Sequence, residues 1–144
     1  LDVNGLAELE ELSCGGNPLT GLQLDQLKKL SSLSISGLHL GSFPRLGNYS
    51  MLTSLDCAEN DLAQLDLTGM KNLSFLNCSN NLLTELDLSE LTQLASINCS
   101  NNQLTSLDVS SSTGLTLRML SEKSLPYRLC RLFTDRGCYS QQQA

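Results

Sequence analysis

The chain has little of what most catalytic and binding sites use. It contains no Trp, 4% aromatic residues and a single His among 144 residues. Asp and Glu number 15 against 9 Lys and Arg, so the net charge is −6, which disfavours binding to nucleic acid through its phosphates. No apolar run approaches the ~18 residues that a membrane helix needs. The sequence therefore predicts neither a nucleic-acid partner nor insertion into a membrane.

Leucine is abundant instead, at 34 of the 144 residues, and it follows a repeat. Three cysteines, Cys57, Cys78 and Cys99, are spaced 21 residues apart. Alignment on them divides the chain into five repeats, at 9–29, 30–51 (with one extra residue), 52–72, 73–93 and 94–114. Residues 1–8 match the second half of a repeat. This start in mid-repeat predicts a piece of a longer array.

The consensus LxxLxCxxNxLTxLDLSxLxx predicts one coil of a solenoid per repeat. Leu76 and Cys78 alternate with polar residues, so they point inward from a short strand. Asn81 follows where the strand must bend, and its side chain is expected to bond backbone groups that the bend leaves unpaired. The LDL segment is expected to form a second short strand or an extended segment. The structural asparagines are Asn17, Asn60, Asn81 and Asn102.

No single repeat can bury its leucines alone, but coils stacked in register at ~4.8 Å bury them continuously. A period of 21 residues leaves no room for a long helix. The sequence therefore predicts a mainly β solenoid with a main parallel sheet, short extended segments on the opposite side, and few or no long helices.

The fixed positions of Leu, Cys and Asn over residues 1–114 resemble the leucine-rich repeat family. The 21-residue, Cys-containing type is similar to repeats of bacterial surface and secreted proteins, including relatives of internalins, although such repeats also occur in some protists. The resemblance implies a right-handed, curved solenoid that binds a protein or glycan ligand on its concave sheet. It also implies a location outside the cell or on its surface.

The second repeat departs from the consensus. Ile35 stands in place of Cys and Leu38 in place of Asn, and GSFPRLGNY replaces the LDLS segment. Phe43 and Leu46 are expected to fill the core there, and Pro44 to interrupt the second extended segment.

The last thirty residues, 115–144, also differ from the array. Residues 1–114 carry 4 basic and 13 acidic side chains, a net of −9, whereas 115–144 carry 5 and 2, a net of +3. Continuing the repeat places Arg118, Lys123 and Arg128 at inward positions, where an unpaired charge is very costly. A degenerate cap, a disordered end and an unnatural continuation all stay open for this tail.

The cysteines are interpreted as structural. Cys14, Cys57, Cys78 and Cys99 share the inward position, where a thiol packs as a small apolar group. No CxxC spacing offers a metal site, so no cofactor is expected. Cys130 and Cys138 lie in the tail and are candidates for pairing with each other. His39 follows a strand whose neighbouring thiols are expected to be buried, which argues against an enzyme.

Acidic residues recur at one outward position, as Asp66, Asp87 and Asp108, with Asp2 before them. A calcium ion needs several oxygen ligands together, but the spacing offers one carboxylate per coil. A solvated face is therefore expected.

The outward side of the main strands is the best candidate for a ligand-binding surface. It is small and polar, and the binding residues proposed are Asp56, Phe75, Asn77 and Asn98. The leading hypothesis is a non-enzymatic module that binds a protein or a glycan. The alternatives are a spacer or scaffold with no ligand of its own and, far behind, a thiol-dependent enzyme. End-to-end self-association through uncovered strand edges also stays open.

Overall fold

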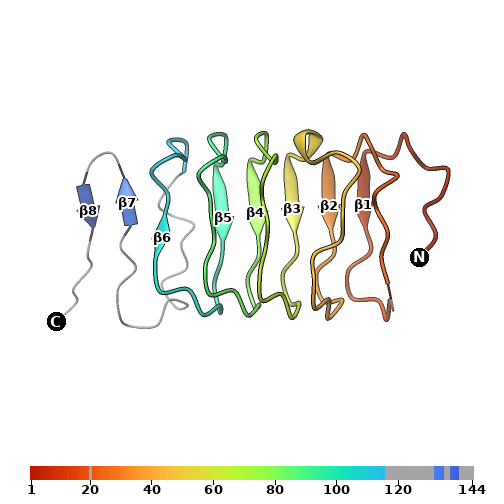
Figure 1. Ribbon diagram of the computed structural model, residues 1–144, viewed down its shortest axis with the longest axis horizontal. Helices are drawn as coiled ribbons and strands as arrows, with labels where there is room; N and C mark the ends of the chain where they lie inside the picture. Colours follow the sequence, from red (N-terminus) through yellow and green to blue (C-terminus); the bar gives the residue numbers. More distant parts are fainter. Residues whose placement is uncertain (20, 116–131, 135–136, 140–144) are drawn as a thin grey trace.

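The protein is described by a computed structural model that places residues 1–19, 21–115, 132–134 and 137–139. Five three-residue strands, one per coil, follow one another at the repeat spacing (Figure 1): β1 (Glu11–Ser13), β2 (Ser32–Ser34), β3 (Ser54–Asp56), β4 (Phe75–Asn77) and β5 (Ser96–Asn98). They form one parallel sheet in the order β1-β2-β3-β4-β5. The mainly β solenoid with a parallel sheet confirms the fold class that the repeat predicts.

The sheet keeps the register of the sequence repeat. Leu55 pairs with Leu76, and Leu76 with Ile97, so each consensus position forms a column that runs across the strands. The inserted residue of the second repeat does not disturb this register, because Leu33 pairs with both Leu12 and Leu55. The alignment of the repeats therefore holds in three dimensions along the whole sheet.

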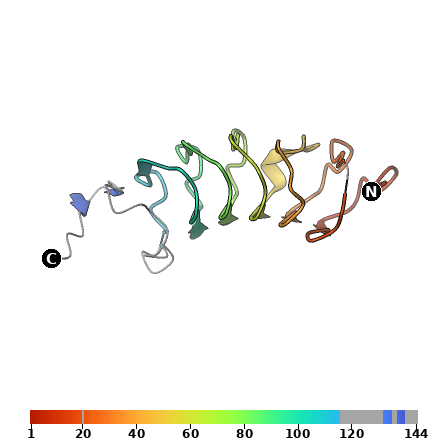
Figure 2. The same cartoon turned by 90° about the horizontal axis from the view of Figure 1, so that it is seen from below.

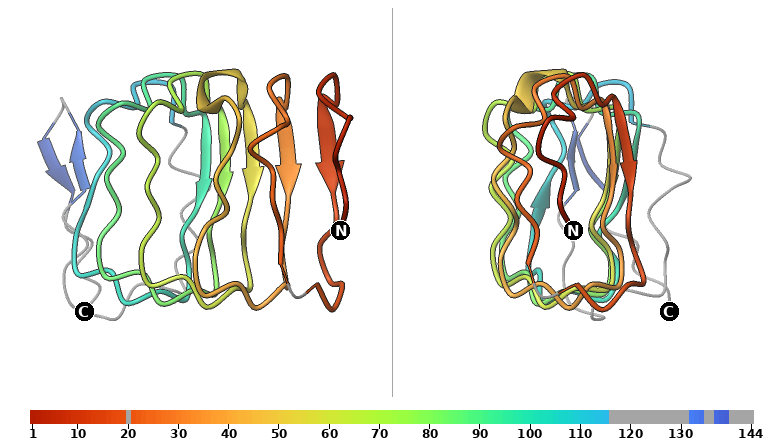
Figure 3. Two further views of the ribbon diagram at one scale, coloured as in Figure 1. Left: turned by 45° about the vertical axis from the view of Figure 1, so that its right-hand side comes forward. Right: turned by 90° about the vertical axis from the view of Figure 1, so that its right-hand side faces the viewer.

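The core lies inside the stacked coils, as the view along the stack in Figure 3 shows. Leu76 and Cys78 are fully buried, which confirms the inward direction expected from their alternation. The later leucines of the same repeat, Leu83, Leu88 and Leu91, are also buried. Neighbouring coils thus share a single apolar core that no coil could form alone.

The side opposite the sheet has little regular structure. Figure 2 shows the strands lined up along one side, with extended chain returning along the other. The LDL segments at 65–67 and 86–88 are extended but not strands, whereas β6 (Leu107–Asp108) is a strand. β6 pairs in parallel with β7 (Leu132–Thr134), and β7 pairs antiparallel with β8 (Gly137–Tyr139). Among the described residues there is no long helix.

Of the tail, the structure describes only residues 115, 132–134 and 137–139. Cys130 is outside them, and so are Arg118, Lys123 and Arg128. The division into a solenoid at 1–114 and a cap or tail at 115–144 therefore stays a prediction, as does a disulfide between Cys130 and Cys138.

In the second coil, other apolar side chains occupy the core positions that the consensus gives to Cys and Asn. Ile35 is fully buried in place of the cysteine, and Leu38 is buried in place of the asparagine. Leu46 is buried and Phe43 packs partly buried against the core, as expected. A short 3-10 helix, η1 (Tyr49–Met51), follows them and has no counterpart in the other coils.

Candidate functional site

The candidate surface, called the sheet face below, consists of the outward side chains of the five strands. In-register pairing arranges them in two columns: Glu11, Ser32, Ser54, Phe75 and Ser96, then Ser13, Ser34, Asp56, Asn77 and Asn98. The alternation along the strands also predicts a third outward column two residues further along the chain, at Gly15, Ser36, Ala58, Ser79 and Ser100. The structure corrects this expectation, because Ala58 and Ser79 in that column are buried. The chain already bends toward the core there.

All four residues proposed for binding lie on the sheet face. Asp56 pairs with Asn77, and Asn77 with Asn98, so the three side chains form a row across three strands. Phe75 lies on the same strand as Asn77, two residues earlier, and therefore points to the same side. Its side chain is 39% exposed, unusual for an aromatic ring in a small protein. The structure brings the four together, and their part in binding stays a prediction.

The row of Asp56, Asn77 and Asn98 is held by short-range hydrogen bonds. Each Oδ1 atom accepts from the backbone N–H two residues later, namely Ala58 at 3.2 Å, Ser79 at 3.3 Å and Ser100 at 3.2 Å. These bonds fix the side chains at the end of each strand, as in an Asx-turn. The sheet face thus presents polar groups at fixed positions, one strand apart.

A ladder of buried asparagines holds the bend behind this surface. The Nδ2 of Asn81 donates to the Cys78 and Ser79 carbonyls of its own coil at 3.1 and 3.2 Å. It also donates to the Cys57 carbonyl of the preceding coil at 3.0 Å, while its Oδ1 accepts from the Leu62 N–H there at 3.1 Å. Asn60 and Asn102 make the same two connections. Each of these asparagines therefore holds the bend of its own coil and also bonds the preceding coil.

Asn17 differs from the other three. Its Nδ2 donates to Cys14 and Gly15 in its own coil, and the side chain is exposed at the start of the sheet. The next coil has Leu38 where its own asparagine would stand, so the ladder skips one coil and resumes at Asn60.

The cysteine column lies in the apolar core. Cys14, Cys57, Cys78 and Cys99 are buried thiols. Burial raises the pKa of the Cys57 thiol to about 12, helped by the nearby Asp56 carboxylate, and raises that of Cys78 well above its usual value. Within residues 1–19 and 21–115, no group of three His, Cys, Asp or Glu side chains is arranged to hold a metal ion. Thiols that stay protonated at neutral pH pack as apolar groups and are poor nucleophiles.

His39 lies on the exposed loop after β2, away from the buried thiols. Its ring is 84% exposed, and its Nδ1 lies 3.6 Å from the Asp61 carboxylate in the next coil. The residue sits at a left-handed φ of 54°. An exposed ring paired with a surface carboxylate does not form a Cys–His dyad.

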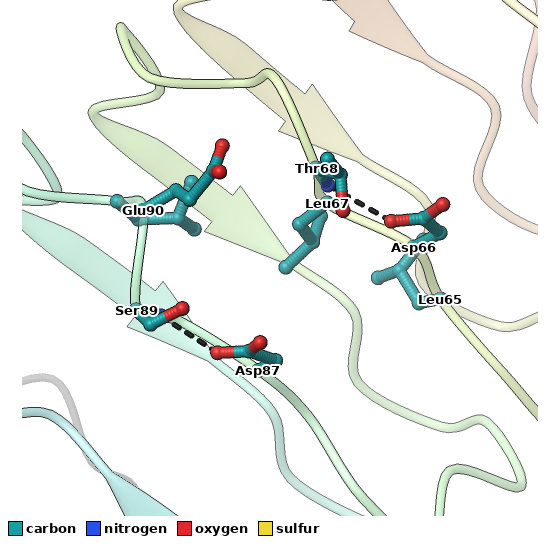
Figure 4. Close-up of a pocket in the computed structure, with 8 residues that line it drawn as sticks. Leu65, Asp66, Leu67, Thr68, Asp87, Ser89 and Glu90 are labelled. Atoms are coloured by element: carbon teal, nitrogen blue, oxygen red, sulfur yellow. Dashed lines mark hydrogen bonds between the residues drawn. The ribbon is translucent and has the colours of Figure 1, made fainter.

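The acidic column lies opposite the sheet, beside a shallow hollow between two coils (Figure 4). Asp66, Asp87 and Glu90 lie along this hollow. The Oδ1 of Asp66 accepts from the Thr68 N–H at 2.9 Å, and that of Asp87 from the Ser89 N–H at 2.8 Å. Both bonds close a bend within the same coil. The aspartates therefore serve as local caps of the extended segments.

Sequence reasoning missed one contact in this hollow. A Glu90 carboxylate oxygen accepts from the Gly69 N–H of the preceding coil at 2.9 Å. Gly69 has a left-handed φ of 84° at this bend. A glycine after the LDLT segment is a signal for such a bend, but the partner across the coils leaves no mark in a repeat alignment.

Stability is expected to fall in acid because of the capping aspartates. The Thr68 hydroxyl and N–H lower the pKa of Asp66, and the Ser89 N–H and hydroxyl lower that of Asp87. The Ser110 N–H and hydroxyl do the same for Asp108. Since each folded pKa lies below the unfolded value of about 3.9, the stabilisation is fully present above that pH. It is lost as the pH falls through the folded pKa values.

Urea midpoints measured from about pH 6 to about pH 2.5 test this expectation. The triple variant Asp66→Asn, Asp87→Asn, Asp108→Asn keeps an acceptor oxygen at each cap but cannot titrate there. Its midpoint should therefore depend less steeply on pH than that of the wild type. Equal pH dependence in the two proteins would contradict the role assigned to these caps.

Comparisons with known proteins place this geometry in context. No family model matches the chain, and no curated protein matches it. Among solved structures, one described as the functional domain of InlJ from Listeria monocytogenes, including a cysteine ladder, is similar, with a TM-score of 0.75 and 38% sequence identity. The match covers 81% of this chain and 26% of that one, so this chain spans about a quarter of the length of that relative.

Proposed function

We propose that the chain, a leucine-rich repeat solenoid with a column of buried cysteines, is part of a non-enzymatic module that binds another protein. The internalin-like neighbour supports a protein-interaction role. The burial of the thiols at Cys14, Cys57, Cys78 and Cys99, and the pairing of the exposed His39 with Asp61, support a binding role over thiol-dependent catalysis.

The sheet face is the surface proposed to make the contact. The observation that carries this is the row of Asp56, Asn77 and Asn98, whose Oδ1 atoms are fixed by backbone N–H groups next to the exposed Phe75 ring. Side chains already held in place lose little conformational entropy when a partner binds. An exposed aromatic ring supplies the apolar area that the polar columns lack.

The proposed location is the cell surface or the extracellular medium, by analogy with the internalin-like neighbour. Within the described residues, no helix is both long and apolar enough to cross a membrane. The neighbour supports a bacterial surface or secreted protein.

Affinity capture with the immobilised chain tests the function. The double variant Asp56→Arg, Asn77→Arg changes the charge of the sheet face by three units and leaves the core untouched. Its matched control is Gln64→Arg, Glu85→Arg, which makes the same charge change at exposed positions on the opposite side. Circular dichroism should show all three proteins equally folded.

A protein partner retained by the wild type and the control, but lost by the sheet-face variant, is the expected result. A partner held equally by all three would contradict the assignment of the surface. Capture of a glycan and of no protein would contradict the proposal that the partner is a protein. Capture of nothing would favour the spacer hypothesis.

A further inference from the structure

Three side chains on the sheet face, Glu11, Asp56 and Phe75, depart from the small polar residues of their columns, and two of them, Asp56 and Phe75, lie on adjacent strands. The column of Phe75 otherwise contains Glu11 at the first strand and serines at Ser32, Ser54 and Ser96. The column of Asp56 otherwise contains serines at Ser13 and Ser34 and asparagines at Asn77 and Asn98. A repeat that supplies small polar residues thus acquires one ring and one carboxylate, on adjacent strands.

The ring and the carboxylate are diagonal neighbours. Ser54 pairs with Phe75 and Asp56 with Asn77, so Phe75 lies one strand over and two residues back from Asp56. With strands ~4.8 Å apart and ~3.3 Å per residue, their Cα atoms are separated by about 8 Å. One cationic group can lie between them, since it bonds a carboxylate at about 2.8 Å and contacts a ring within about 6 Å of its centre.

Neither group is occupied by a cation of the chain itself. The ion pairs among the described residues join Lys29 to Glu8 and His39 to Asp61. The sheet face carries no Lys or Arg in either column, and residues 1–114 have a net charge of −9, from 4 basic and 13 acidic side chains. The Asp56 carboxylate uses Oδ1 for the Ala58 N–H at 3.2 Å and keeps Oδ2 for a partner.

We infer that Phe75 and Asp56 form a binding site for a cationic side chain, an arginine in a basic segment of the partner protein. The flat guanidinium stacks on the exposed ring while its N–H groups bond the carboxylate. Asn77, which lies on the strand of Phe75 and opposite Asp56, flanks both groups. This inference rests on the proposed function, because it specifies the chemistry of the partner at the sheet face.

Amide chemical-shift titration of the folded chain with a tetra-arginine peptide tests the site. Phe75→Ser and Asp56→Asn restore the residues found at the same positions of neighbouring strands, and Asp56→Asn keeps the Oδ1 cap. Each is expected to weaken binding about three-fold, and the two together about ten-fold, at low salt. Glu11→Ser is the matched control, since it removes one negative charge from the same face, at β1, and should leave the affinity unchanged.

Three results would overturn the site. The first is an equal loss of affinity in Glu11→Ser and Asp56→Asn, which would show that the peptide responds only to the overall charge of the sheet face. The second is unchanged binding in Phe75→Ser. The third is a cello- or chito-oligosaccharide that shifts the amides around Phe75 more strongly than the peptide does, which would assign the surface to a glycan.

Capture of the natural partner separates this inference from the proposed function. A partner lost by Asp56→Arg, Asn77→Arg but fully retained by Phe75→Ser, Asp56→Asn would keep the sheet face as the binding surface and overturn the cationic site. A partner lost by both double variants supports the site.

Discussion

Replacing Asn81 with alanine is expected to lower the free energy of unfolding by about 3 kcal/mol. The substitution strips the Cys57, Cys78 and Ser79 carbonyls and the Leu62 N–H of the hydrogen bonds that the asparagine supplies. All of these lie where the chain bends beneath the surface, so water cannot easily replace the side chain. Urea denaturation followed by circular dichroism measures the change.

Asn17→Ala is the matched control for Asn81→Ala. Asn17 occupies the same position of the repeat but is exposed and bonds only its own coil, through the Cys14 and Gly15 carbonyls. Its loss should cost about 1 kcal/mol or less, since water reaches the carbonyls it leaves. Equal costs at the two positions would show that the bonds between coils add nothing to stability.

Replacing Leu76 with alanine is expected to cost about 3–4 kcal/mol. Leu76 is fully buried, with Leu55 and Ile97 beside it in the same inward column. Removing its branched end leaves a cavity between two coils that are fixed by the sheet and by the asparagine ladder. The structure can therefore relax only slightly to fill it.

Two further variants show whether packing decides this cost. Leu12→Ala makes the same change at the outermost strand, where the side chain is only partly buried, and should cost about 1 kcal/mol. Leu76→Ile introduces the residue that the next coil already has in Ile97, and should cost less than about 1.5 kcal/mol. Urea midpoints for the three variants check the order. A cost at Leu12 equal to that at Leu76 would contradict the assumption that interior coils are packed more tightly.

The sequence predicts the sheet well because the same pattern of inward and outward residues recurs in successive coils. An inward Leu or Ile and a Cys, followed by Asn three residues after the Cys, appear in the same relative positions in four coils, so a register deduced from alignment becomes a register of strands. The same alternation predicts that the residues proposed for binding, Asp56, Phe75, Asn77 and Asn98, share one face, and the structure has them there.

What the repeat does not predict depends on contacts within a single coil or on departures from the consensus. The burial of Ala58 and Ser79 follows from the direction of the bend, which alternation alone does not give. The Asp66 and Asp87 carboxylates close bends of their own, and this keeps the LDL segments extended without a ladder of strands. The helix η1 lies at the end of the second repeat, which is one residue longer than the consensus.

The bonds that Asn81 and Asn102 make to the preceding coil also make a coil an exchangeable unit in evolution. Deleting residues 73–93 would place Asn102 against the Cys57 carbonyl and the Leu62 N–H, the groups that Asn81 bonds in the intact chain. Unequal recombination within the gene can therefore add or remove whole coils and leave no buried polar group unpaired. Changes of any other length must be absorbed locally, as the second coil absorbs its additional residue. The number of coils, and with it the extent of the sheet face, can thus vary while the chemistry of each coil stays the same.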